Sequence, residues 1–193
     1  MIGRFDHSLV IMKAIRIGFL LGAGAALSAV VFSEFGFVFN FTHSAPFGLY
    51  RPAPKPTQSS HGASPYAFFC PDQQWPGLKD NPNTRRSLGT CPDGYAALLK
   101  PVVAWPGDAV TTSPSGVAVN GTLVSNSAPL TRDSLGRELH PYPYGTYQVQ
   151  AEQIWVVSSY SSKSFDSRYF GPVPLKTVRE WVRPLITEQY CAH

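Results

Sequence analysis

The sequence predicts a mainly β domain of antiparallel strands behind one N-terminal transmembrane helix. Eighteen prolines and sixteen glycines among 193 residues favour turns and short strands over long helices. Asn120-Gly121, between Val119 and Thr122, is the strongest short signal for a β-hairpin. Residues 17–32, IGFLLGAGAALSAVVF, carry no charge. A hydrophobic content of 44% is sufficient for a packed core.

The apolar N-terminal segment predicts a membrane anchor. A spanning helix needs about 20 apolar residues, and flanking apolar residues bring the segment near that length, although Glu34 interrupts it. We expect an anchor over residues 1–34 and a separate domain over residues 35–193. A cleaved secretory signal, with small residues near Ser28-Ala29, and a buried core helix are the alternatives.

Charge indicates how the segment is oriented. Three basic residues precede it: Arg4, Lys13 and Arg16. By the positive-inside rule this flank stays in the cytoplasm and the domain lies on the other side of the bilayer. Because the segment is expected to be an anchor, the lipid bilayer is an expected partner. The net charge of +4 is mild, and Arg85-Arg86 is a single basic pair rather than a patch. We therefore expect no nucleic-acid partner.

The cysteines fit an exported domain. Cys70 and Cys91 each begin a Cys-Pro-Asp triplet and flank a polar loop. A disulfide between them would stabilise the fold by about 3 kcal/mol in an oxidising compartment; two unpaired thiols are the alternative. Cys191 is left over. No His or Cys lies at zinc-ligand spacing, so we predict no metal and no cofactor.

Apolar runs and turn residues place the strands. Residues 66–70 and 154–159 are typical of strands, and residues 109–125 give a strand, a turn, a strand and the hairpin. Residues 95–105 predict one buried strand bent at Pro101, or two short strands. The other predictions are turn-rich segments over 40–56 and 164–174, a loop over 126–146, a strand over 147–150, and a short helix or last strand over 175–182.

Lys100 stands between two apolar runs, Leu98-Leu99 and PVVAW. Burying an ammonium is costly unless it is paired or gives up its proton. Desolvation lowers the pKa of a lysine, so that its amine can be neutral near pH 7 and can accept the proton of a serine hydroxyl. The alternative is a lysine that reaches from a strand end into water.

Ser44 is a candidate partner for that lysine. It lies in THSAPFGLY, residues 42–50, directly before an Ala-Pro turn, which would present its hydroxyl on a loop. Thr42 can direct its hydroxyl the same way and help bind an oxyanion. His43 is a poor base for Ser44, because neighbouring side chains of an extended segment point to opposite sides.

Four blocks occur in a fixed order along the chain. They are Ser44 in THSAPFGLY, Lys100 in LLKPVVAWPGDAV, Asn120-Gly121 in VAVNG, and SFDSRYFGPVP at residues 164–174. Together they resemble the type I signal peptidase superfamily, and specifically its conjugative-transfer branch of TraF type. The resemblance extends over about residues 40–185.

The resemblance implies a membrane-anchored serine peptidase with a signal-peptidase-like β fold. By motif position Ser44 is the nucleophile, Lys100 the general base, and Thr42 a support of the oxyanion hole. The Ser-x-Asp-Ser-Arg block corresponds to Ser164, Asp166, Ser167 and Arg168. In it the first serine orients the lysine, and the aspartate and arginine form a supporting pair. In the conjugative branch the aspartate, here Asp166, is also implicated in activity.

The resemblance also implies a substrate and a location. Enzymes of this branch trim an exported pilin precursor, and some join its ends into a circle. We expect that substrate, contacts with other conjugation proteins, and a single-pass protein of the bacterial inner membrane with a periplasmic catalytic domain. A general signal peptidase is less favoured, since SSYSSKSFDSR lacks the usual Gly-Asp-Asn. A non-catalytic component of a conjugation or secretion apparatus is less favoured because Ser44, Lys100 and Asp166 are intact.

Overall fold

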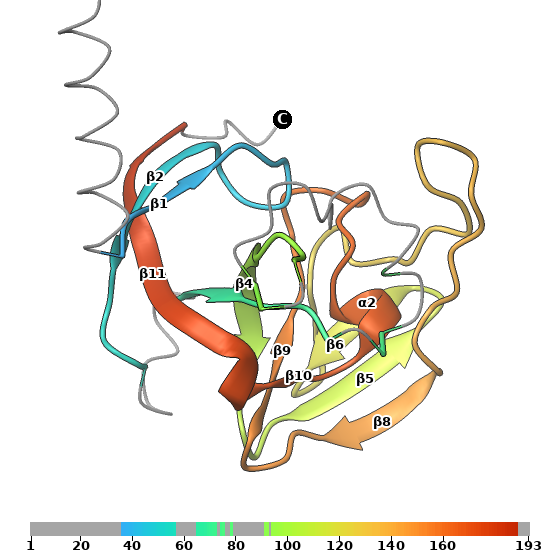
Figure 1. Cartoon of the computed structure of the whole chain (residues 1–193). Coiled ribbons are helices and arrows are strands. Elements are labelled where there is room, and N and C mark those ends of the chain that lie inside the picture. The colour runs from blue at the N-terminus through green and yellow to red at the C-terminus, as the bar shows by residue number, and fades with distance from the viewer. Residues whose placement is uncertain are drawn as a thin grey trace, which may run out of the picture. The chain divides into compact units, whose positions relative to one another are not determined.

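A computed structural model describes residues 36–56, 65–72, 74–75, 78, 91–92 and 94–188. The anchor expected over residues 1–34 and the third cysteine, Cys191, lie outside these residues. Within the described part of the chain, no helix is long and apolar enough to cross a bilayer. This part is mainly antiparallel β, as the sequence predicts (Figure 1).

The larger of two sheets has seven strands, in the order β1-β2-β11-β3-β4-β9-β10. Every neighbouring pair in it is antiparallel. Its strands are β1 (Val38–Asn40), β2 (Gly48–Pro52), β3 (Tyr66–Phe69), β4 (Leu98–Ala104), β9 (Gln153–Val156), β10 (Val173–Pro174) and β11 (Val178–Thr187). Strand β4 therefore lies inside the sheet, between β3 and β9, and it carries Lys100 opposite Ala67.

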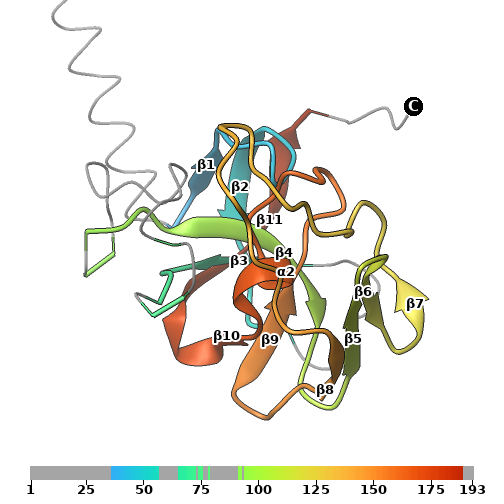
Figure 2. The same cartoon turned by 90° about the vertical axis from the view of Figure 1, so that its right-hand side faces the viewer.

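A second sheet of four strands has the order β7-β6-β5-β8. It contains β5 (Ala109–Ser113), β6 (Gly116–Val119), β7 (Thr122–Leu123) and β8 (Gly145–Gln148). In both views this sheet lies on the opposite side of the domain from β1 and β2 (Figures 1 and 2). The Asn120-Gly121 turn joins β6 to β7, and both turn residues have positive φ, 49° and 80°, as a tight hairpin turn requires.

Two short helical turns complete the architecture. Helix α2 (Ser167–Phe170) follows β9, and the 3-10 turn η3 (Leu175–Thr177) precedes β11. The largest apolar cluster packs the side chains of Phe165, Tyr169 and Phe170, from in and around α2, against those of strands β3, β4 and β9. This packing fixes the α2 segment beside the strand that carries Lys100.

The structure refines several predicted elements. Residues 98–104 form one strand, and its pairing with β9 shifts register between Val102 and Ala104 rather than at Pro101. The segment 40–56, predicted to be turn-rich, contains the end of β1 and all of β2. The alternatives for residues 175–182 both hold in part, since η3 is followed by β11.

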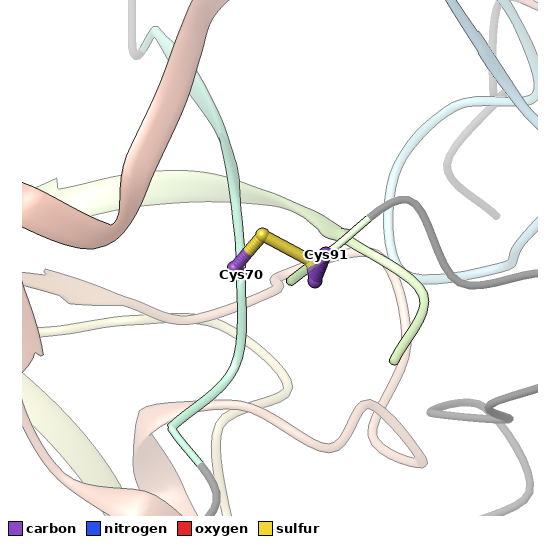
Figure 3. Close-up of a disulfide and its surroundings, with 2 residues drawn as sticks. All are labelled: Cys70 and Cys91. Carbon is purple, nitrogen blue, oxygen red and sulfur yellow. A yellow bond between two sulfur atoms is a disulfide. The ribbon is translucent and has the colours of Figure 1, made fainter. Parts of the chain in front are cut away.

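A disulfide joins Cys70 to Cys91 (Figure 3). The two Cα atoms lie 5.6 Å apart, within the usual range for a bridge. Cys70 directly follows β3, and the buried Cys91 packs with Leu78 and Tyr95. The bridge expected from the two Cys-Pro-Asp triplets is thus present, and it closes the loop between β3 and β4.

Candidate active site

Ser44 lies in the loop that connects β1 to β2. The pair Asn40 and Gly48 closes this hairpin, and Ser44 is half-buried in a turn between them, with Ala45 buried beside it. Gly48 has φ 138°, and a Cβ atom there would collide with the carbonyl oxygen of Ile186 in β11. Only glycine permits this close approach, which holds the loop against the sheet.

The Lys100 amine lies between two serine hydroxyls. Its Nζ is hydrogen-bonded to Oγ of Ser44 at 2.6 Å and to Oγ of Ser164 at 3.0 Å. The Lys100 side chain is buried, with 5% exposure. Among the described residues it forms no ion pair. Three segments remote in sequence, the β1–β2 loop, β4 and the segment before α2, thus meet at one nitrogen atom.

Burial controls the protonation of this lysine. Desolvation lowers the pKa of Lys100 from 10.5 to about 8. The carboxylate of Asp166 opposes this change, and the guanidinium of Arg168 adds to it. A neutral amine has one lone pair and two N–H groups. It can therefore accept the Ser44 proton while an N–H group is held by Ser164, which is the geometry of an activated serine nucleophile.

Asp166 and Arg168 form a fully buried ion pair, with Nη2 and Oδ2 2.7 Å apart. Asp166 caps α2, because its Oδ1 accepts from the backbone N–H and from Nε of Arg168. Its Oδ2 also accepts from the backbone N–H of Ser158. The pair forms at the start of this short helical turn.

The Arg168 guanidinium also binds four backbone carbonyl groups. These belong to Asn126, Ser158, Ser161 and Ser162. The acidic partner raises the pKa of Arg168 against the effect of its burial. With these bonds the arginine fixes the segment that ends in Ser164, one of the two hydroxyl partners of the lysine.

The residues predicted from the motifs fall into two groups. The structure brings Ser44, Lys100 and Ser164 into direct contact. Asp166 makes no hydrogen bond to Ser44 or Lys100 among the described residues. Its neighbour Ser167 accepts a hydrogen bond from the backbone N–H of Val156 at 3.0 Å, and so joins α2 to β9.

The remaining predicted residue, Thr42, is exposed. Its hydroxyl donates to Oδ1 of Asn40 at 2.8 Å. In this arrangement the hydroxyl proton is directed to the amide of Asn40, and the oxygen of Thr42 offers only its lone pairs to other groups.

Sequence reasoning missed two residues that support the loop carrying Ser44. Asn40 bonds the backbone N–H of Thr42, two residues on, and this Asx-turn pattern is a readable signal before a turn. Tyr50 donates its hydroxyl to the carbonyl oxygen of Pro46 at 2.8 Å. Its ring lies 5.1 Å from that of Tyr66, and burial raises the pKa of both phenols, which therefore stay protonated. Only the tertiary structure shows that Tyr50, the second of these two residues, supports the loop.

No group of three or more His, Cys, Asp or Glu side chains within the described ranges is placed to hold a metal ion. The groups that meet at this site are the hydroxyls of Ser44 and Ser164 and the buried amine of Lys100. Residues 18–183 match the family model described as signal peptidase, peptidase S26. The chain belongs to this S26 family. Membership supports a serine peptidase, and it agrees with the serine and lysine that the fold brings together.

Sequence relatives of known name place the chain more closely. It is 37% identical over 180 residues to a plasmid transfer protein TraF of Escherichia coli, covering 92% of this chain and 98% of that protein. It is 34% identical to the conjugal transfer protein TraF of Agrobacterium fabrum, covering 91% of this chain and 97% of the relative. The chain is thus a TraF-type member of the family.

A solved structure of a signal peptidase I from Enterococcus faecalis V583 aligns with a TM-score of 0.34 and 18% identity. The alignment covers 65% of this chain and 95% of that chain. Because the TM-score is this low, the alignment adds nothing to the match with the S26 family.

Proposed function

We propose that this chain is a membrane-anchored serine endopeptidase that uses a Ser44–Lys100 dyad. The observation that carries the proposal is the buried amine of Lys100, 2.6 Å from the Ser44 hydroxyl and 3.0 Å from that of Ser164. A pKa lowered to about 8 gives this amine a substantial neutral fraction near physiological pH. The S26 family match supports the same reaction class.

The reaction begins when the Ser44 oxygen attacks the scissile carbonyl carbon and neutral Lys100 takes the Ser44 proton. A C–O bond forms, and the negative charge passes to the carbonyl oxygen. The ammonium then gives its proton to the leaving amine as the C–N bond breaks, which leaves an ester of Ser44. Attack by water, with Lys100 again as base, releases the product acid.

The oxyanion requires hydrogen-bond donors close to Ser44. The backbone N–H of Ser44 makes no hydrogen bond to other described residues, so it is the first donor. The Thr42 hydroxyl is a second donor only after it rotates away from Asn40. Asp166 and Arg168 act through the segment that carries Ser164, and we assign Asp166 a positioning role.

The substrate we propose is an exported pilin precursor of a conjugation system. The support is the similarity to relatives named for plasmid and conjugal transfer. The acyl-enzyme offers two outcomes. Water gives a trimmed linear product, and the amino terminus of the substrate gives a circle with no water consumed. The anchor expected over residues 1–34 would hold the catalytic domain on the periplasmic face of the inner membrane, beside such a substrate and other conjugation proteins.

A mass measurement on a co-expressed pilin precursor tests this function. Wild-type enzyme should remove a terminal peptide, and a circular product should be lighter than the trimmed linear product by one water. Ser44→Ala should leave the precursor intact, while the control Ser125→Ala, at an exposed serine, should process it normally. Processing by Ser44→Ala, or an intact precursor with the wild-type enzyme, would contradict the proposal.

A further inference from the structure

Asn40 is a buried amide at the end of β1, with 4% exposure. Its Nδ2 donates to the carbonyl oxygens of Thr42 at 2.9 Å, Ala45 at 2.9 Å and Pro46 at 3.0 Å. Its Oδ1 accepts from the backbone N–H of Thr42 at 3.1 Å and from the hydroxyl of the same residue at 2.8 Å. One side chain therefore bonds the loop on both sides of Ser44.

The chemistry of this position requires an amide. Three carbonyl oxygens converge on Nδ2, and two donors converge on Oδ1, so the orientation of the amide is fixed by its surroundings. A carboxylate would place an anion against three carbonyl groups, and a hydroxyl is too small to reach both sides. Without the Asn40 donor, the buried carbonyl group of Ala45 would be left with unmet hydrogen-bonding capacity, and that of Pro46 would keep only the hydroxyl of Tyr50.

We propose that Asn40 is the positioning residue of the nucleophile. Its hydrogen bonds hold residues 42–46 around its amide, so that the Ser44 hydroxyl lies against the Lys100 amine. The inference rests on the proposed Ser44–Lys100 dyad and adds the element that aligns it. Asn40 makes no hydrogen bond to Lys100 or Ser164, so its effect passes through the loop alone.

The test compares Asn40→Ala with Val110→Ala. Val110 is fully buried in the cluster of the four-stranded sheet, and its truncation serves as the matched destabilising control. We expect Asn40→Ala to lower kcat about 100-fold, the size of a 1 Å misplacement of a reacting group, with little change in KM. Val110→Ala should lower the melting temperature and leave kcat unchanged. Asn40→Ser keeps an acceptor for the Thr42 N–H and should be intermediate; it also serves if Asn40→Ala does not fold.

Hydrogen exchange of residues 41–47 gives a readout that needs no activity. Exchange of this loop should rise in Asn40→Ala and stay at the wild-type level in Val110→Ala. Unchanged loop exchange, or equal kcat for the two variants at equal melting temperature, would overturn the positioning role. If wild type and Ser44→Ala are equally inactive on the precursor, the proposed function fails, and the exchange measurement still decides whether Asn40 holds the loop.

Discussion

Two buried cationic side chains lie close to each other in this domain, and they differ in whether a carboxylate compensates their charge. Arg168 is 2% exposed, is paired with Asp166, and donates to four backbone carbonyl groups. Lys100 is 5% exposed and touches two neutral hydroxyl groups. The first charge is fully compensated. The second has no carboxylate in contact among the described residues, and its pKa falls to about 8.

Under the proposed function, the difference separates a structural charge from a reactive one. A paired guanidinium stays protonated and holds its segment in place. An unpaired ammonium in the same low-dielectric surroundings is destabilised, and the neutral amine becomes available as a base. Asp166 therefore serves the site best by binding Arg168 and leaving Lys100 without a direct counterion.

Replacing the buried lysine with an arginine should have the largest effect. Lys100→Arg is expected to lower kcat/KM about 10⁴-fold, at the upper end of general-base contributions, because a guanidinium does not deprotonate in proteins. Turnover of the purified variant on a precursor peptide checks this. Lys163→Arg, at an exposed lysine, is the control. An active Lys100→Arg enzyme would remove the base role.

Breaking the structural pair should act on stability. Asp166→Asn leaves Arg168 buried without its counterion, which typically costs about 3–5 kcal/mol. We expect a large fall in melting temperature and measurable turnover in the fraction that remains folded. Asp133→Asn, which breaks the more exposed pair with Arg137, should change the melting temperature little. A folded Asp166→Asn enzyme with normal stability and severely reduced turnover would instead place Asp166 in the chemistry.

The lowered pKa of Lys100 predicts how kcat/KM and the stability of the fold change with pH. Because the base must be neutral, kcat/KM should rise about tenfold per pH unit below pH 8 and level off above it. In the folded protein the pKa of Lys100 is about 8, below the ordinary value of 10.5. Below pH 8 the lysine is charged in the folded and the unfolded state, so burying the charge lowers the free energy of unfolding by its full amount. That cost, about 3 kcal/mol, disappears as the pH rises to 10.5.

Lys100→Met isolates this contribution. The stability difference between the variant and wild type should favour the variant most below pH 8 and decline toward pH 10.5. Denaturant unfolding at several pH values measures it. A difference that does not change with pH would contradict the lowered pKa of Lys100.

Removing the second hydroxyl should have the smallest effect. Ser164→Ala deletes one of the two hydrogen-bond partners of the lysine, and a hydrogen bond of about 1 kcal/mol corresponds to a rate loss of roughly fivefold. The melting temperature should change little. Comparing turnover and melting with those of Ser125→Ala shows whether the hydroxyl orients the amine. A rate equal to wild type would restrict the site to Ser44 and Lys100.

The sequence made the strand pattern and the disulfide readable. Asn120-Gly121 fixed a hairpin because few other residues adopt positive φ there, and a loop rich in Pro, Gly and Asn between two cysteines indicated a bridge. The strands β1 and β2 were missed because they are short and adjoin a segment dominated by turn residues. The ends of α2 and η3 likewise depend on caps and packing that local composition does not reveal.

By itself, the sequence identified the groups to which we assign the chemistry: a serine before an Ala-Pro turn and a lysine between two apolar runs, in motifs that resemble those of signal peptidases. Only the tertiary structure decided their relations. Residues separated by 56 and 64 positions in the chain meet at the Lys100 amine, and Asn40 bonds three carbonyl groups at once. Desolvation of Lys100, the bonds of Arg168 and the curl of the Ser44 loop all arise from packing between distant segments, which no local pattern encodes.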